Sequence, residues 1–308
     1  MEITMTGPSP AAFAETQSPS GGQAALRPDP TARLADLAVL VDGTAADEDA
    51  IACCETIAAV FGAHLDVFLV NHIGLPVLPA GPGAGWLAAQ VVEQCERVGD
   101  AAALQLRERL GRLGVAWELR RRDGAMSEIL PEVVRLSGTC DLVGISQQAL
   151  SSSVGMDLLE AVVFTAGSGA LVAPRRGAAA AVMPETILVG WRDTPECAHA
   201  VAAALPFLQR AGQVVLASVA EEGSSEQRGL EPMADMARHL ARHGVSVETR
   251  ELANWQDAAE GLMHEAEVLG AQMIVIGAYG HSRMRELLLG GVTRELLRSS
   301  RVPLLLAH

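Results

Sequence analysis

Hydrophobic and polar positions alternate in blocks along this chain. Short apolar runs that end in polar or glycine-containing turns are typical of buried parallel strands, whereas apolar residues three and four positions apart predict helices. Residues 34–44 show the first pattern, and the segment after them shows the second, with Ile51, Ile57 and Phe61 on one side. Gly62 follows as a predicted helix stop. The strand pattern and the helix pattern then alternate along the rest of the chain.

The order of these blocks occurs twice. The predicted strands of the first unit cover residues 34–44, 64–70, 114–122, 140–146 and 170–174. Those of the second unit cover residues 185–191, 213–219, 245–252, 271–277 and a last strand that begins at Pro303. Helical patterns separate them, among them a long one at 86–113, one at 194–212 with Thr194 as N-cap and Pro195 first, and one at 226–244 that Gly244 ends. Strands that alternate with helices predict parallel sheets with helices on both faces.

Composition changes suggest the domain boundaries. Residues 1–32 are rich in Pro, Ser, Gly and Ala and predict a disordered tail. The first domain is then expected at 33–174 and the second at 185–308, joined by a low-complexity linker at 175–184. Aromatic residues make up only 3% of the chain, so Ala, Val and Leu must build the core.

Charge and targeting signals exclude several classes of function. The formal net charge of -14 argues against general binding of nucleic acid or of an anionic membrane. No apolar run approaches the about 20 residues of a membrane span, and the N-terminus does not resemble a signal peptide, so we expect a cytoplasmic protein. The arginines at 120–122 are interpreted as a solvated strand end.

Cysteine and histidine positions predict no metal site. The five cysteines lack CxxC or Cys/His zinc spacing and are expected to be buried, reduced thiols. The histidines on the predicted helices also lack metal-binding partners at a useful spacing; these are His199, His239, His243 and His264.

Glycines follow the fourth predicted strand of the second unit. Gly277 and Gly280 can adopt a positive φ and have no Cβ to hold a phosphate away from the backbone, while Gly290 and Gly291 lead into a helix near Val292. In open parallel sheets, ligands bind beyond the carboxyl ends of the strands, and a helix start offers unpaired N–H donors to an anion. Thr293 adds a hydroxyl to the first turn. The loop matches neither the Walker A motif nor GxGxxG, so a strand-to-helix turn that merely needs glycine is the alternative.

This stretch resembles the C-terminal signature of universal stress proteins, Gly-x2-Gly-x9-Gly-(Ser/Thr), in which the loop holds ATP phosphates. Gly277, Gly280 and Gly290 fall on its three glycines. Gly291 stands where the family usually has Ser or Thr, so one hydroxyl contact is missing while the N–H remains. The resemblance extends over both units. It implies an α/β fold of two tandem open parallel-sheet domains with helices on both faces, like the adenine-nucleotide α-hydrolases.

The family pattern also has an Asp in the turn after the first strand. Asp42 occupies this position in the first unit, and Arg192 occupies it in the second, with Asp193 beside it. Arg192 is expected to pair with phosphate or ribose, or else to be a solvated turn residue. By analogy with the family, the adenine would lie near Trp191 or near residues 217–219.

The corresponding loop of the first unit has lost the glycines. Ser146 and Ala149 replace the first two, and counting along the loop places Leu159 and Glu160 at the last Gly-Gly position. A Glu there would repel phosphate. We therefore predict one nucleotide site per chain, in the second unit.

The resemblance implies a stress-response sensor or regulator that binds ATP or a related adenine nucleotide, with or without Mg²⁺, and that is not an enzyme. The two units are expected to pair about a pseudo-twofold axis, with a homodimer as a further possibility. One alternative is an interaction protein of the same fold without nucleotide. Another is a slow ATPase, for which Asp193 is the candidate base.

Overall fold

The structure of the chain, a computed structural model, describes residues 34–74, 84–175, 183–219, 226–253, 255–278 and 290–308. The predicted tail at 1–32, most of the predicted linker and Gly280 lie outside these ranges.

The first unit follows the predicted alternation of strands and helices. Its strands are β1 (Asp36–Val41), β2 (His64–His72), β3 (Trp117–Gly124), β4 (Leu142–Ser146) and β5 (Ala170–Ala173). Its α-helices are α1 (Asp47–Phe61), α2 (Ala84–Leu110), α3 (Met126–Ser137) and α4 (Ser153–Glu160). A 3-10 turn, η1 (Ala149–Ser151), precedes α4, and a π-helical turn, η2 (Ala161–Thr165), follows it.

The second unit repeats the same order. Its strands are β6 (Thr186–Gly190), β7 (Gln213–Val219), β8 (Val247–Leu252), β9 (Met273–Gly277) and β10 (Leu304–Ala307). Its helices are α5 (Pro195–Leu208), α6 (Glu226–Arg242), α7 (Ala258–Leu269) and α8 (Gly291–Ser299). The predicted alternation is confirmed in both units.

Local sequence signals mark several helix ends. Thr194 is the N-cap of α5, where its side chain accepts from the Cys197 N–H, and Pro195 is the first helical residue, as predicted. Gly62 and Gly244, the predicted stops, have left-handed φ values of 68° and 79°. These ends depend on neighbouring residues alone, which is why the sequence predicts them.

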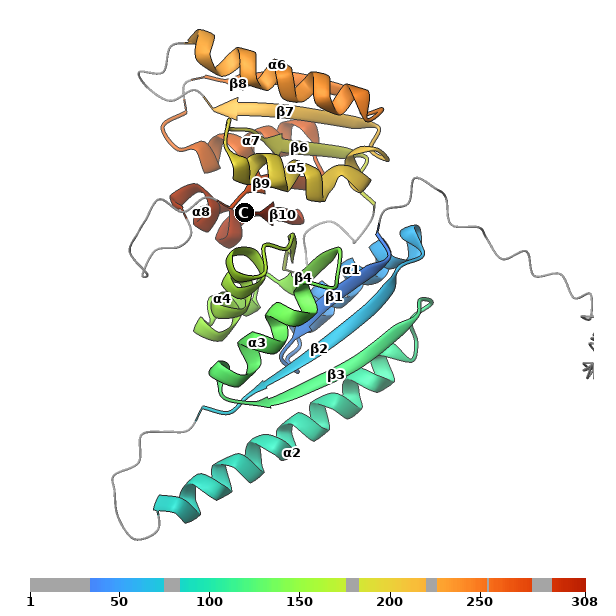
Figure 1. Ribbon diagram of the computed structural model, residues 1–308, viewed down its shortest axis with the longest axis vertical. Helices are drawn as coiled ribbons and strands as arrows, with labels where there is room; N and C mark the ends of the chain where they lie inside the picture. The colour runs from blue at the N-terminus through green and yellow to red at the C-terminus, as the bar shows by residue number, and fades with distance from the viewer. Residues whose placement is uncertain (1–33, 75–83, 176–182, 220–225, 254, 279–289) are drawn as a thin grey trace, which may run out of the picture.

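The ten strands of the described ranges belong to one continuous sheet (Figure 1). The order is β3-β2-β1-β4-β5-β10-β9-β6-β7-β8, so each unit has the same internal arrangement. Pairing is parallel within each unit, but β5 and β10 pair antiparallel, with Leu171 opposite Leu305. The last strands of the two units therefore join them edge to edge, as expected of a pseudo-twofold pair.

Helices cover both faces of this sheet. Helices α1, α2, α5 and α6 pack on one face, and α3, α4, α7 and α8 pack on the other. Each of the two apolar clusters contains residues of both units. On the first face, the rings of Phe61 and Phe207 meet edge to face, with centroids 5.6 Å apart. The two units thus share their core.

The cysteines are free thiols in the structure. Cys53, Cys54 and Cys197 are buried, whereas Cys95 and Cys140 are half-buried, which corrects the expectation that all five are buried. Burial raises the pKa of Cys53 to about 12, which keeps this thiol protonated. Within the described ranges, no helix has both the length and the apolar character needed to cross a bilayer.

Candidate functional site

A cavity of about 300 Å³ lies beyond the carboxyl ends of β6 and β9. These neighbouring strands flank the position where the strand order reverses, because β7 follows β6 on one side and β9 pairs with it on the other. The predicted site residues that the structure describes all line the cavity: Trp191, Arg192, Gly277, Gly290, Gly291, Val292 and Thr293. The structure thus brings together two segments that lie about a hundred residues apart in the sequence.

One wall of the cavity is apolar. Ala217 and Val219 come from β7, and Ala258 and Leu262 come from the start of α7. Trp191 adjoins them and is only 6% exposed. Both positions expected near an adenine, Trp191 and the end of β7, therefore lie on the same cavity. This wall can bury the faces of a flat aromatic group.

The N-terminus of α8 forms another part of the lining. Gly290 is its N-cap residue, in an extended conformation with φ of -63° and ψ of 160°, and it has no side chain with which to cap the helix. In the described part of the chain, no side chain caps the N–H groups of this first turn. Unpaired donors and the helix dipole together favour an anion here. Thr293, in the same turn, adds a hydroxyl beside the cavity.

Gly277 and Gly291 are glycines for different reasons. A Cβ on Gly277 would lie 2.6 Å from the Cys197 backbone nitrogen, so the first turn of α5 can pack there only against glycine. Gly277 is not among the glycines with a positive φ, which corrects the expectation from the sequence. Among the described residues, none lies within 4 Å of the position that a Cβ on Gly291 would take. With respect to this part of the chain, Gly291 leaves open space at the start of α8.

Arg192 occupies the position of Asp42, as the sequence comparison predicts. Gly190 pairs with Ile276 as Leu40 pairs with Ile145, and the two turn residues follow these strands at the same distance. Arg192 is exposed at the cavity. A solvated turn residue and a cation near a bound anion are both compatible with this position.

Asp193 does not line the cavity. It lies in a separate hollow beyond Trp191, together with Asp235 and His239. No Asp or Glu is found among the described residues that line the cavity. The candidate base for hydrolysis is therefore placed away from it.

Glu196 stands behind the cavity, in the first turn of α5. Burial acts to raise its pKa, but hydrogen bonds from its own backbone N–H and from the Thr194 hydroxyl outweigh that effect and lower the pKa. Glu196 is therefore ionised at neutral pH.

The turn after β1 in the first unit satisfies its own donors. The Asp47 carboxyl accepts from the Asp42 N–H at 3.1 Å and from the Gly43 N–H at 2.8 Å. Asp47 is buried, and this burial raises its pKa to about 7. The N–H groups that could face a ligand in this turn are occupied from within the chain.

The helix after β4 is also capped internally. Ser152 is the N-cap of α4, and its Oγ accepts from the Gly155 N–H at 3.0 Å. The sequence-based placement of Leu159 and Glu160 at the helix start is wrong: both lie at the end of α4, and Leu159 is buried. The error arises because α4 begins sooner after β4 than α8 begins after β9, so counting from the strand misaligns the two loops.

The lining residues that the sequence did not identify include Cys197, Ala258 and Leu262. They lie on α5 and α7, on helix faces whose apolar spacing predicts only a core position. No local signal distinguishes an apolar residue beside a cavity from one in the core.

Comparisons with known proteins agree with this architecture. Residues 183–308 match the sequence model of the universal stress protein family. No curated protein sequence matches the chain. A universal stress protein from Archaeoglobus fulgidus DSM 4304 is similar in structure, with a TM-score of 0.66 at 14% identity, covering 88% of this chain and 97% of that one.

Two further solved structures are similar. A putative universal stress protein from Pseudomonas aeruginosa UCBPP-PA14 has a TM-score of 0.56 at 15% identity, covering 91% of this chain and 95% of that one. A universal stress protein in complex with cAMP has a TM-score of 0.32 at 21% identity, covering 41% of this chain and 98% of that one. The likenesses over about 90% of the chain show the tandem fold. Residues 183–308 thus carry the sequence pattern of the universal stress protein family, and the chain as a whole has the fold of its tandem members.

Proposed function

We propose that the second unit binds ATP or a related adenine nucleotide, one per chain, and that the protein acts as a stress-response sensor or regulator. The observation that carries the proposal is the cavity at the ends of β6 and β9, whose lining combines apolar side chains with the uncapped start of α8. Such a pairing of an apolar slot with anion-binding donors suits a base and its phosphates.

Each part of the nucleotide has a matching group. The phosphates would accept from the first-turn N–H groups of α8 and from the Thr293 hydroxyl, with Arg192 supplying positive charge. The base would lie between Trp191 and Leu262. These local groups act at contact distance, where they outweigh the overall negative charge, which salt screens. Mg²⁺ would enter with the phosphates, since no carboxylate is found among the described lining residues.

The cavity favours binding without hydrolysis. A water that attacks a phosphate needs a residue to orient it or to accept its proton. Asp193 lies in the neighbouring hollow instead. We therefore propose a nucleotide-binding protein rather than an enzyme.

A second candidate is an interaction protein of the same fold without nucleotide. The packing of α5 against Gly277 favours it, because that contact explains this glycine without any ligand. The open space at Gly291 has no such packing explanation and favours the nucleotide.

Calorimetry on the full chain tests the proposal. We expect ATP to bind with one site per chain, and we expect a mass spectrum of molecules released from the natively purified, denatured protein to contain an adenine nucleotide. Absence of heat at millimolar nucleotide, together with no released nucleotide, would favour the second candidate. Phosphate release should not exceed that of a Gly290→Val variant; a clear excess would establish an ATPase instead.

A further inference from the structure

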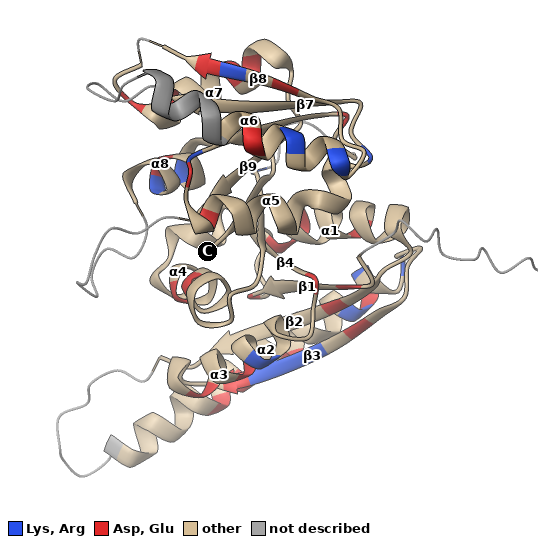
Figure 2. Cartoon of the chain, turned by 45° about the horizontal axis from the view of Figure 1, so that its top comes forward, with Lys and Arg blue, Asp and Glu red and all other residues tan. Residues whose placement is uncertain are grey.

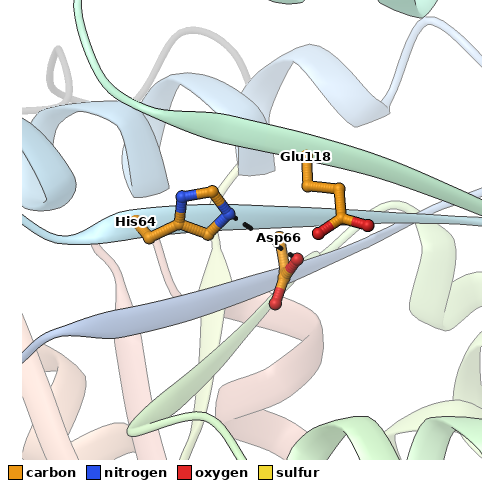
Figure 3. A group of neighbouring side chains, drawn as sticks. All are labelled: His64, Asp66 and Glu118. Atoms are coloured by element: carbon orange, nitrogen blue, oxygen red, sulfur yellow. Dashed lines mark ion pairs between the residues drawn. The ribbon is translucent and has the colours of Figure 1, made fainter.

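A second cluster of functional side chains lies in the first unit, at the amino-terminal ends of β2 and β3. His64 and Asp66 alternate on β2, and Asp66 lies opposite Glu118 of β3 in the parallel register. The three side chains approach one another on the same face of the sheet (Figure 3). One ligand atom from each, a ring nitrogen and two carboxylate oxygens, lies within 4.8 Å of the other two.

These distances are close to those of a metal site. Zinc lies about 2.0–2.2 Å from nitrogen and oxygen ligands, so two ligands of one tetrahedral ion are about 3.4 Å apart. His64 Nε2 and Asp66 Oδ1 are 3.8 Å apart. The Glu118 side chain is 56% exposed and can rotate toward them without repacking the core. A small closure of the cluster would therefore complete three bonds.

Asp66 provides an independent indication that the cluster binds a cation. The residue is only 8% exposed, and its Oδ1 is buried without a hydrogen-bond partner in the described part of the chain. Arg120 Nη2 donates to the other carboxylate oxygen, Oδ2, at 3.5 Å, and lies 3.3 Å from Oδ1 without hydrogen-bond geometry toward it. A buried carboxylate oxygen left in this state is costly unless a cation compensates it.

The second unit supplies an internal comparison. Leu65 pairs with Trp117 as Val214 pairs with Val247, so Gln213 and Val215 stand in the places of His64 and Asp66. In the second unit, Val215 occupies the position that Asp66 has in the first. The fold therefore does not require a buried carboxylate at Asp66.

The edge strand, by contrast, keeps its charged pair in both units. Glu248 and Arg250 correspond to Glu118 and Arg120 in the register. Arg250 pairs with Glu248 at 3.0 Å and with Glu265 of α7 at 2.6 Å, which completes that ion pairing. The His and the Asp are thus additions of the first unit to a charged pair that both units have.

Charge balance also favours a cation. Arg120 Nη2 lies 3.3 Å from both Asp66 and Glu118, while Asp36 of β1 lies opposite His64 in the register. The neighbouring arginines are engaged elsewhere, Arg121 with Asp100 and Asp123 and Arg122 with Glu132. Figure 2 shows the resulting mixture of both charges along β3. Three carboxylates beside one guanidinium leave room for a divalent cation.

We propose that His64, Asp66 and Glu118 bind a divalent transition-metal ion of the zinc type, in competition with Arg120. The Arg120 side chain is 38% exposed and can turn to solvent when the metal enters. Three protein ligands leave a fourth position for water. An imidazole with two carboxylates selects Zn²⁺ over Mg²⁺ or Ca²⁺, which prefer all-oxygen ligand sets.

Zinc titration of the metal-stripped full chain, without nucleotide, tests the proposal. We expect one equivalent of Zn²⁺ to bind, with at least tenfold weaker affinity in His64→Ala and in Glu118→Gln, and no such site for Mg²⁺. Arg120→Gln should bind Zn²⁺ several-fold more tightly, because it removes the competing cation. His64 and Glu118 are both partly exposed, so circular dichroism should show that these two variants keep the fold.

Two matched variants serve as controls. Glu248→Gln changes the corresponding glutamate of the second unit, and His72→Ala changes a histidine at the other end of β2. Neither should alter zinc binding. Equal zinc binding in all variants would place the metal elsewhere. If the unaltered chain binds no zinc, the cluster is only a network of ion pairs. Either result overturns the proposal.

Discussion

The two units have the same strand order but treat the backbone donors beyond their strands differently. In the first unit, Asp47 accepts from the turn after β1, and Ser152 caps the helix after β4. In the second, the helix after β9 begins at two glycines that cannot cap it, and a cavity lies in front. The same fold thus closes one potential anion site with its own side chains and leaves the other open. Satisfied donors stabilise a structure, whereas open donors are available to a ligand.

The largest expected effect is a loss of stability when the apolar core shared by the two units is disrupted. Phe207→Ala should lower the free energy of unfolding by about 3–5 kcal/mol, because this fully buried ring also contacts Phe61 across the unit boundary. Denaturant unfolding gives the magnitude, and hydrogen exchange resolves each unit. Protection of the backbone amides from exchange should fall in both units. Loss confined to the second unit would show that the units are stable independently, and Val60→Ala, at an exposed position of α1, should change stability little.

Asp47 should make the first unit sensitive to pH. Its pKa is raised from 3.8 to about 7 in the folded chain, so the folded state favours the protonated form. That contribution to stability is fully present below about pH 4 and is lost as the pH rises through about 7, at about 1.4 kcal/mol per pKa unit. Urea unfolding between pH 4 and 8 should show the stability of the unaltered chain falling more steeply than that of Asp47→Asn. Parallel curves would exclude this role for the carboxyl.

The open site should respond to an added carboxylate. Gly291→Glu should weaken ATP binding at least tenfold by repulsion of the phosphates, with little change in stability, because a side chain there enters open space. Calorimetry measures the affinity. Ser153→Glu, which adds the same charge at the start of α4, is the control and should leave binding unchanged. Equal affinities in all three proteins would place the nucleotide elsewhere.

The smallest effects concern the helix caps. Ser152→Ala and Thr194→Ala should each lower the free energy of unfolding by about 1 kcal/mol, since each removes a side-chain acceptor from a helix start. Only Thr194→Ala should also change nucleotide affinity, because Thr194 lines the cavity. Thermal unfolding and calorimetry on both variants measure the two effects. A change in nucleotide affinity with Ser152→Ala would contradict the placement of the nucleotide site in the second unit alone.

Much of the fold could be predicted because its signals are local. Apolar runs, helical spacing, the Thr194 cap and the stop at Gly62 each depend on a few neighbouring residues. The glycine loop could be placed at the strand ends for the same reason. Counting residues failed at Glu160, where loops of different length separate corresponding strands and helices.

The sequence by itself determined the two βα repeats, the order of their elements and the segments that meet at the cavity. Only the tertiary structure decided that the antiparallel pairing of β5 with β10 makes one sheet of both units, that Gly277 serves the packing of α5, and that His64, Asp66 and Glu118 converge. The physical reason is register. Periodicity along one strand tells which face a side chain occupies, but the residue beside it belongs to another strand, and hydrogen bonding between the strands sets that alignment.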